Sequence, residues 1–227
     1  MPGNRTLRAL AARRGELAGL FGGVLLPLLT FGALGEEVWE REGFGWDAPL
    51  LLALHRHATP TLDAALIRVT DAGGPLPMAC LAALVLAFLM ARRRLGDATF
   101  VGLAVGGAAT LNFLAKALFQ RSRPALWLAA LPETDYGFPS GHAMGSLAVI
   151  ATLIILLWPT RWRWPALLLG TPFVLAVGIS RVYLGVHYPS DILAGWCAAL
   201  VWIVGTHLLL IRPLTRWVVR RRSAWAT

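Results

Sequence analysis

The hydrophobic positions of the chain gather in six long runs, and the polar positions gather between them. Runs of about 17–25 residues have the length that an α-helix needs to cross the apolar core of a bilayer. The pattern therefore predicts an all-α polytopic membrane protein with six transmembrane helices, forming a single domain over residues 1–227. The runs lie at about Leu17–Gly35, Gly73–Ala91, Ala98–Phe119, His142–Pro159, Trp164–Arg181 and Asp191–Ile211.

The connection between the first two runs, Glu36–Ala72, is long and carries two short apolar-periodic pieces on either side of Pro60. Thr59 and Thr61 have side chains of the type that caps helices. The pieces are too short and too polar to span, so we expect short helices that lie in the membrane interface. His55 and His57 have no carboxylate or cysteine at ligand spacing, and we expect no direct chemical role for them.

The composition is typical of a membrane protein, because 57% of the residues are hydrophobic and only 15% are charged. A soluble domain of this length would hide its apolar residues in one core and expose many charges. No cleavable signal peptide is evident, since the first apolar run follows a long basic head and lacks an obvious cleavage site.

The formal net charge of +9 would also suit a nucleic-acid-binding protein, but the positions of the charges argue against that class. Fourteen arginines fall on one side of a six-span arrangement, and ten of the twelve acidic residues fall on the other. Because cytoplasmic loops carry an excess of positive charge, both termini are predicted to be cytoplasmic in a cell inner (plasma) membrane. We expect the basic residues to contact lipid headgroups, with no nucleic-acid partner. The arginines are Arg5, Arg8, Arg13, Arg14, Arg92–Arg94, Arg161, Arg163, Arg212, Arg216 and Arg220–Arg222.

Three pieces of chain bring polar side chains to the opposite, periplasmic or extracellular side. The first is "KALFQRSRP", Lys116–Pro124. Lys116 lies near the end of an apolar run, where a lysine is costly unless it snorkels or meets an anion. Arg123 follows about two helical turns later, so the two cations can share a helix face. A plain basic flank would be expected on the other side of the membrane, which favours a role in anion binding.

The second piece is "PSGH", Pro139–His142, which opens an apolar helix. Ser140 is a typical N-cap, and Gly141 lets a ligand approach the backbone. The first amides of a helix have no internal partners, and with the helix dipole they suit a phosphate group. We interpret this helix start as a phosphate cradle with His142 beside the ligand, since ordinary capping does not explain the histidine.

The third piece is "SRVYLGVHYPSD", Ser180–Asp191. Arg181 offers a planar fork that matches phosphate oxygens. His187 and Asp191 are four residues apart, and a bond from one ring nitrogen to the carboxylate would fix the tautomer. The other nitrogen would then be free to act as a nucleophile.

The three pieces together indicate phosphoryl transfer, which depends on positioning and on stabilising charge at the phosphate oxygens. Lys116, Arg123 and Arg181 supply three cations for this purpose. No carboxylate cluster suggests a magnesium or zinc site, so we expect no metal and no cofactor.

These pieces resemble the three signature motifs of the type 2 phosphatidic acid phosphatase family, integral membrane lipid phosphatases that are related to vanadium haloperoxidases. The family pattern is Lys, six residues, Arg-Pro; then Pro-Ser-Gly-His; then Ser-Arg, five residues, His, three residues, Asp. This sequence fits it at every motif position and in the same order, in residues 116–124, 139–142 and 180–191. The resemblance covers roughly Asp47–Trp202.

The resemblance implies a six-span protein with a site near the outer surface and a covalent mechanism. In that mechanism His187 attacks phosphorus and becomes phosphohistidine, while Asp191 orients and polarises it. His142 protonates the leaving oxygen and then activates water. The residues that the resemblance assigns to the phosphate oxygens are Lys116, Arg123, Ser140, Gly141 and Arg181.

A site at the membrane edge suits a lipid whose tail stays in the bilayer. The resemblance implies a lipid phosphate or diphosphate, with undecaprenyl diphosphate favoured and phosphatidylglycerol phosphate or phosphatidic acid next. One alternative is a lipid phosphotransferase with the same intermediate. A second is a non-catalytic lipid-binding or transport protein, which the presence of His142, His187 and Asp191 disfavours. Six spans argue against a vanadate-dependent haloperoxidase, and the oligomeric state stays open.

Overall fold

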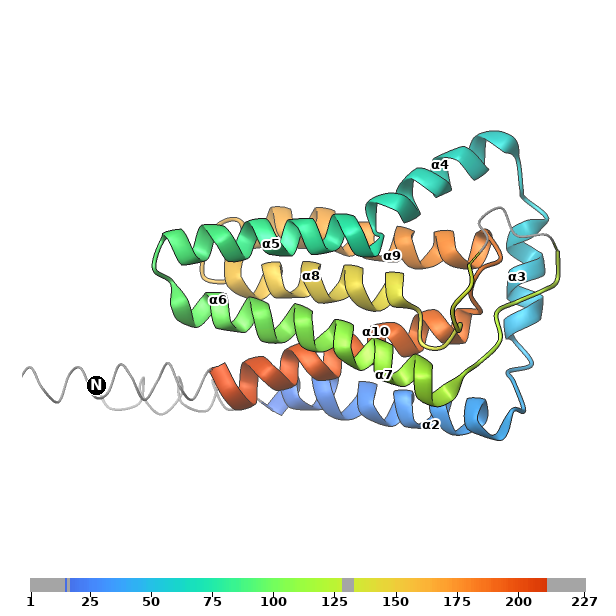
Figure 1. Cartoon of the computed structure of the whole chain (residues 1–227), viewed down its shortest axis with the longest axis horizontal. Helices are drawn as coiled ribbons and strands as arrows, with labels where there is room; N and C mark the ends of the chain where they lie inside the picture. The colour runs from blue at the N-terminus through green and yellow to red at the C-terminus, as the bar shows by residue number, and fades with distance from the viewer. Residues whose placement is uncertain (1–14, 16, 128–132, 212–227) are drawn as a thin grey trace, which may run out of the picture.

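The computed structural model describes residue 15, residues 17–127 and residues 133–211, and every regular element in these ranges is helical (Figure 1). The all-α prediction is therefore confirmed. The helices are α2 (Leu26–Glu40), α3 (Asp47–His55), α4 (Pro60–Ala72), α5 (Pro75–Ala91), α6 (Leu95–Val101), α7 (Gly107–Phe119), α8 (Gly141–Leu157), α9 (Arg163–Tyr183) and α10 (Pro189–Gly205). Segments of π-helix precede α2 (Phe21–Leu25), join α6 to α7 (Gly102–Gly106) and follow α10 (Thr206–Ile211).

Five helical segments among the described residues are long and apolar enough to cross a membrane: Leu17–Glu40, Pro60–Ala91, Leu95–Phe119, Arg163–Tyr183 and Pro189–Leu208. The remaining predicted run is α8, an apolar helix of 17 residues that is shorter than the other five. Each predicted run is thus helical, while the count of six crossings stays a prediction.

The helix α8 lies at the centre of the bundle and packs against α5, α7, α9 and α10, and α2 packs on the outside of α10 (Figure 1). Small residues let these helices approach closely, as is common in membrane bundles. A Cβ atom on Gly195 of α10 would lie 2.8 Å from the backbone oxygen of Ser140. Glycine at this position therefore lets the start of α10 reach the start of α8, where the polar motifs are.

The central core combines large and small apolar side chains from three helical segments, and its members are at most 1% exposed. They are Phe100, Ala104, Ala108, Met144, Ala148, Ala199 and Ile203. Many leucine and phenylalanine side chains on the outer surface of the bundle are instead exposed, including Phe88, Leu114 and Leu168. An apolar outer surface is the arrangement expected where lipid, rather than water, surrounds the helices.

The short helices predicted on either side of Pro60 are α3 and α4. Of the two predicted caps, Thr59 is the N-cap of α4, because its hydroxyl accepts a hydrogen bond of 3.2 Å from the backbone N–H of Leu62, whereas Thr61 lies inside the helix. Figure 1 shows both helices at the end of the bundle where α8 and α10 begin. Their placement in a membrane interface stays a prediction.

The described basic turns lie at the end of the bundle opposite to that where α8 and α10 begin. Arg92–Arg94 join α5 to α6, and Arg161 and Arg163 lie where α8 passes into α9, at the left in Figure 1. The other arginines used to predict topology lie outside the described residues. The two ends of the bundle therefore differ in charge as the sequence predicts.

Candidate active site

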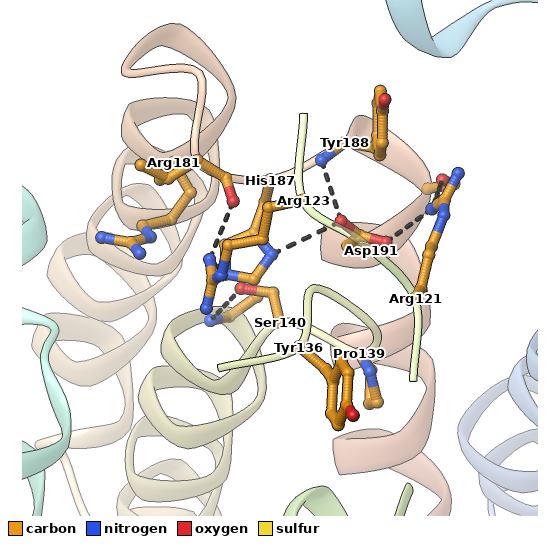
Figure 2. Close-up of polar contacts among 12 residues, drawn as sticks. Arg121, Arg123, Tyr136, Pro139, Ser140, Arg181, His187, Tyr188 and Asp191 are labelled. Atoms are coloured by element: carbon orange, nitrogen blue, oxygen red, sulfur yellow. Dashed lines mark hydrogen bonds and ion pairs between the residues drawn. The ribbon is translucent and has the colours of Figure 1, made fainter. Parts of the chain in front are cut away.

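Side chains from all three motifs lie close together, among them Arg123, Ser140, Arg181, His187 and Asp191 (Figure 2). They come from the ends and beginnings of helices that pack on α8, so the fold brings together residues far apart in the sequence. Lys116 is near the end of α7, Arg123 follows it, Ser140, Gly141 and His142 begin α8, Arg181 is near the end of α9, His187 precedes α10 and Asp191 is in its first turn.

The imidazole of His187 lies between a carboxylate and a guanidinium (Figure 2). Its Nδ1 is 3.4 Å from Asp191 Oδ2, and its Nε2 is 2.9 Å from Arg123 Nη1. Arginine can only donate, so Nε2 accepts and the proton of the neutral ring belongs on Nδ1. The same oxygen, Asp191 Oδ2, also accepts a hydrogen bond of 2.9 Å from the backbone N–H of Tyr188.

His187 and Asp191 are almost completely buried, with side chains 1% and 0% exposed. Burial lowers the pKa of His187 well below its ordinary value of 6.5, and the positive charges of Arg123 and Arg181 lower this pKa further. The imidazole is therefore neutral at pH 7. A neutral ring with its free lone pair toward a guanidinium has the form that a nucleophilic histidine requires.

The turn before α10 sets the position of this histidine. Gly185 has φ +74°, which favours glycine, and a Cβ there would lie 2.6 Å from the Trp127 ring. The carbonyl oxygen of Arg181 accepts hydrogen bonds from the N–H groups of Val186 and His187 at 3.2 and 3.3 Å. The end of α9 thus holds the backbone of the nucleophile candidate directly.

Two carboxylates that the sequence analysis did not single out lie among the three cations. Glu133 bonds to Arg181 Nη2 and, at 3.0 Å, to Arg123 Nη2. Asp135 bonds to Lys116 Nζ and to Arg123 Nη2. Burial raises the pKa of Asp135, but the hydrogen bonds from Lys116 and Arg123 outweigh it and bring the pKa to about 2. Burial also raises the pKa of Glu133, and Arg181 with Arg123 lowers it overall, so both groups are anionic at pH 7.

The start of α8 has the predicted cap. The Ser140 hydroxyl accepts from the Ala143 N–H at 3.5 Å, and the Ser140 N–H donates to the backbone oxygen of Asp191 at 3.0 Å. The second bond ties the "PSGH" piece to the start of α10. His142 is half-buried, and its Nε2 faces the junction of α4 and α5, where a Cβ on Gly74 would be 3.6 Å away. The charges of Arg181 and Glu133 act on it electrostatically.

Arg121 and Asp47, neither of which was predicted to have a role, form a second network behind the histidine. Arg121 donates to Asp191 Oδ1 at 2.5 Å and to Asp47 Oδ2 at 2.9 Å. Asp47 also accepts from the Ser190 hydroxyl at 2.5 Å and from its N–H at 3.0 Å. The guanidinium lies 4.5 Å from the centre of the Tyr188 ring. This network therefore holds the carboxylate that contacts His187.

The signals for these additional residues were weak. Arg121 lies inside "KALFQRSRP", but its contacts are with Asp47 and Asp191, which are 74 and 70 residues away. Glu133 and Asp135 belong to a connection without helical periodicity. The connection holds two arginines and two acids, but its sequence does not indicate which of these charges pair.

The geometry suits attack on an anionic group bound by the cations. A neutral imidazole directs its lone pair toward guanidinium groups, and a carboxylate behind it can offset the charge that develops on the ring. Cations around the developing charge stabilise a transition state most effectively when burial excludes water. The arrangement can supply a nucleophile and an anion site, contributed by three separate pieces of chain.

Comparisons with known proteins agree with this geometry. The sequence model of the PAP2 superfamily matches residues 97–213. An undecaprenyl-diphosphatase of Sulfolobus acidocaldarius is 28% identical over 178 residues, which are 76% of this chain and 82% of the relative. Phosphatidylglycerophosphatase B of Bacillus subtilis is 29% identical over 147 residues, which are 63% of this chain and 72% of the relative.

A solved structure shares the fold. The crystal structure of a transmembrane PAP2-type phosphatidylglycerolphosphate phosphatase from Bacillus subtilis superposes with a TM-score of 0.73 at 23% identity. The superposition covers 86% of this chain and 96% of that one. The bundle of α2 to α10 is therefore an arrangement already seen in an experimental membrane-protein structure.

Proposed function

Because the chain belongs to the PAP2 superfamily and is a membrane phosphatase, we propose that it hydrolyses a phosphomonoester or diphosphate of a membrane lipid through a phosphohistidine at His187. The observation that carries the proposal is the orientation of the imidazole. Nε2 faces the guanidinium of Arg123, whereas Nδ1 faces the carboxylate of Asp191. The nitrogen that is free to attack is thus the one directed toward the anion site.

In the first half of the reaction, the phosphate oxygens bind Lys116, Arg123 and Arg181 and the start of α8, with Ser140 and Gly141. The lone pair on His187 Nε2 forms a bond to phosphorus as the P–O bond to the lipid breaks. Nδ1–H stays against Asp191, which offsets the positive charge of the phosphorylated ring. His142 donates a proton to the leaving oxygen, so the lipid departs as an alcohol or as the shorter phosphate.

In the second half, His142 is left as a base and takes a proton from water. The water oxygen forms a bond to phosphorus, and the P–N bond to His187 breaks. Neutral His187 is restored, His142 carries the proton it had at the outset, and inorganic phosphate leaves. Splitting the transfer in this way replaces one difficult step by two easier ones.

An apolar groove beside the site supports a lipid substrate. It has a volume of about 400 Å³, lies between α2, α7 and α10, and is lined by side chains that include Phe31, Leu118 and Trp202. The groove reaches Pro139, the residue before the cap of α8. A lipid whose tail lies in this groove would have its phosphate near the start of α8. A water-soluble phosphate ester has no apolar tail to fill such a groove.

The favoured substrate is undecaprenyl diphosphate, followed by phosphatidylglycerol phosphate and phosphatidic acid. The test is phosphate release by detergent-purified protein from each of these lipids. A clear ranking would identify the substrate. Release that needs an added alcohol acceptor would support a phosphotransferase, and no release under any condition would support a lipid-binding or transport protein.

We propose an orientation with cytoplasmic termini and the site on the periplasmic or extracellular side of a cell inner membrane. The described basic turns, Arg92–Arg94 and the pair Arg161 and Arg163, lie at the end of the bundle away from the site. Such turns are typical of cytoplasmic loops. In this proposal residues 1–227 form one transmembrane phosphatase domain.

Activity is expected to be independent of metal ions. Lys116, Arg123 and Arg181 supply the positive charge at the phosphate oxygens that a magnesium ion supplies in many phosphoryl-transfer enzymes. The measurement is the rate of phosphate release with and without EDTA, which we expect to agree within about twofold. Complete loss in EDTA that added magnesium restores would contradict the mechanism.

Replacement of Arg121 by glutamine is expected to lower kcat about 10²-fold with little change in KM. Arg121 contacts Asp191 and Asp47 rather than the anion site, so its loss should disturb the orientation of the nucleophile and not substrate binding. Unpairing two buried carboxylates should also destabilise the protein by about 3–5 kcal/mol.

The variant Arg121→Lys tests the same residue with the charge retained, since one ammonium cannot reproduce both guanidinium contacts. It should lie between the wild type and Arg121→Gln in kcat. Arg56→Gln is the matched control, because Arg56 is an exposed arginine at the same end of the bundle. If Arg121→Gln has the kcat and melting temperature of Arg56→Gln, the network has no positioning role.

A further inference from the structure

All three cations assigned to phosphate are already bonded to carboxylates of the chain itself. Glu133 bridges Arg181 and Arg123, and Asp135 bridges Arg123 and Lys116. Both acids come from the connection that precedes α8, so they are separate from the motif residues. The anion site is thus occupied by two anionic groups from within the protein.

The carboxylates cover the cations closely. The side chains of Lys116, Arg123 and Arg181 are 14%, 12% and 1% exposed. Glu133 uses both of its oxygens on two guanidinium groups, and Asp135 uses both of its oxygens on Arg123 and Lys116. Poorly hydrated cations are costly when they lose their counter-charge. A ligand that displaces the two carboxylates must therefore supply the negative charge and the hydrogen-bond acceptors that they give to the three cations.

The charge that a ligand brings then decides whether it can enter. A phosphomonoester carries between about 1.5 and 2 negative charges at pH 7, because its second pKa is about 6. It can replace two carboxylates with little loss of charge, and a diphosphate can do the same. A phosphodiester carries one negative charge and has two non-bridging oxygens. Exchanging both carboxylates for a phosphodiester would leave part of the cation cluster without a counter-charge.

We propose that Glu133 and Asp135 are specificity-determining residues that exclude phosphodiester headgroups from the active site. This inference rests on the proposed lipid phosphatase function and deepens it. The surrounding bilayer is made of phospholipids whose headgroups are phosphodiesters, and they reach the same interface as the substrate. A device that penalises the wrong ligand gives selectivity that attraction to phosphate alone does not supply.

Electrostatics connects Glu133 to the proposed proton donor as well. The charge of Glu133 acts on His142 through space, in addition to its bonds to the two arginines. When a dianionic phosphate replaces Glu133, it takes over this interaction, so His142 keeps a neighbouring anion. A monoanion that left Glu133 in place would share Arg123 and Arg181 with it and would meet its repulsion. The acid that would discriminate between ligands by their charge, Glu133, therefore also influences the proposed proton donor, His142.

The test compares the wild type with Glu133→Gln/Asp135→Asn, which keeps the shape of both side chains and removes their charge. Phosphate release from short-chain phosphatidic acid is measured while short-chain phosphatidylglycerol is added as a phosphodiester inhibitor. We expect the inhibition constant for phosphatidylglycerol, divided by KM for phosphatidic acid, to fall at least about tenfold in the variant. Glu40→Gln/Glu42→Gln is the matched control, because it removes two exposed acids from the same end of the bundle.

Direct binding provides a readout that does not depend on turnover. Calorimetric titration of both lipids into His187→Ala, with and without the two charge-removing changes, should give the same tenfold change in the ratio of dissociation constants. Each single change, Glu133→Gln or Asp135→Asn, should give part of this change in the ratio. If the double variant does not fold, the single variants are used in its place.

The outcomes separate this inference from the proposed function. Hydrolysis of phosphatidic acid with an unchanged ratio in every variant would overturn the role of the two acids and leave the phosphatase intact. An equal gain in affinity for both lipids would also overturn it, because the acids would then compete with anions without selecting among them. Both proposals would fail if no form of the protein bound or hydrolysed phosphatidic acid, phosphatidylglycerol phosphate or undecaprenyl diphosphate.

Discussion

Replacement of His187 by alanine is expected to abolish phosphate release, with kcat falling at least about 10⁴-fold. The imidazole is buried, neutral and held between Arg123 and Asp191. No hydrogen bond or ion pair joins His142 to a carboxylate among the described residues, and the ring of His55 stacks on that of Trp127 with 3.9 Å between their centres. Loss of the attacking nitrogen removes the covalent route altogether.

The measurement is single-turnover and steady-state phosphate release by purified His187→Ala beside the wild type. His57→Ala is the matched control, because His57 is an exposed histidine in the turn after α3 and should retain full activity. A melting temperature close to that of the wild type would show that the variant folds. Retention of most of the activity by His187→Ala would show that the nucleophile has been assigned wrongly.

Replacement of Asp191 by asparagine is expected to lower kcat by about 10³–10⁴-fold while KM changes little. Asp191 accepts from His187 Nδ1 and from Arg121, and it does not reach the anion site. An asparagine can present N–H donors to Nδ1, which would place the ring proton on Nε2 and block the lone pair that attacks. The variant would still bind substrate through Lys116, Arg123 and Arg181.

The measurement for Asp191→Asn is kcat and KM determined separately, with Asp71→Asn as the matched control. Asp71 is an exposed acid near the end of α4 and should tolerate the change. Asp191→Glu should recover part of the lost kcat, since it restores an anion behind the ring. A kcat within about tenfold of the wild type for Asp191→Asn would mean that tautomer control has no part in the reaction.

The helical architecture was predictable because long apolar runs have few structural solutions in a membrane. The bounds of the runs agree with the helices to within a few residues except in the first, where the helix continues from Gly35 to Glu40. Acidic residues at that end, Glu36 and Glu37, made the run look shorter. Hydropathy marks where lipid contact ends, whereas a helix can continue past that point into water.

The convergence of the motif residues was also predictable, since they lie at ends of runs that share one side of the membrane. Arg123 and His187 come from separate pieces of chain, yet their nitrogens are 2.9 Å apart. The order of the apolar runs is enough to place these ends at the same side. The individual contacts need the packing of α8 on α9 and α10, which a pattern of hydropathy does not contain.

The additional residues were not predictable, because their roles depend on partners far away in the sequence. Asp47 bonds to Ser190 at a separation of 143 residues, and no local pattern around it indicates this. Glu133 and Asp135 lie in an irregular connection, where periodicity carries no information. Charge pairing of this kind is visible only once the tertiary structure brings the groups together.

The most direct test of the account is to look for the covalent intermediate. Purified wild type is mixed with a lipid phosphate that carries ³²P in its terminal phosphate, quenched rapidly in base, and digested for peptide mapping. The account predicts an acid-labile, base-stable label on the peptide that contains His187, formed and lost at rates that match turnover and absent from His187→Ala. Turnover without a labelled protein, or a label on a different residue, would contradict it.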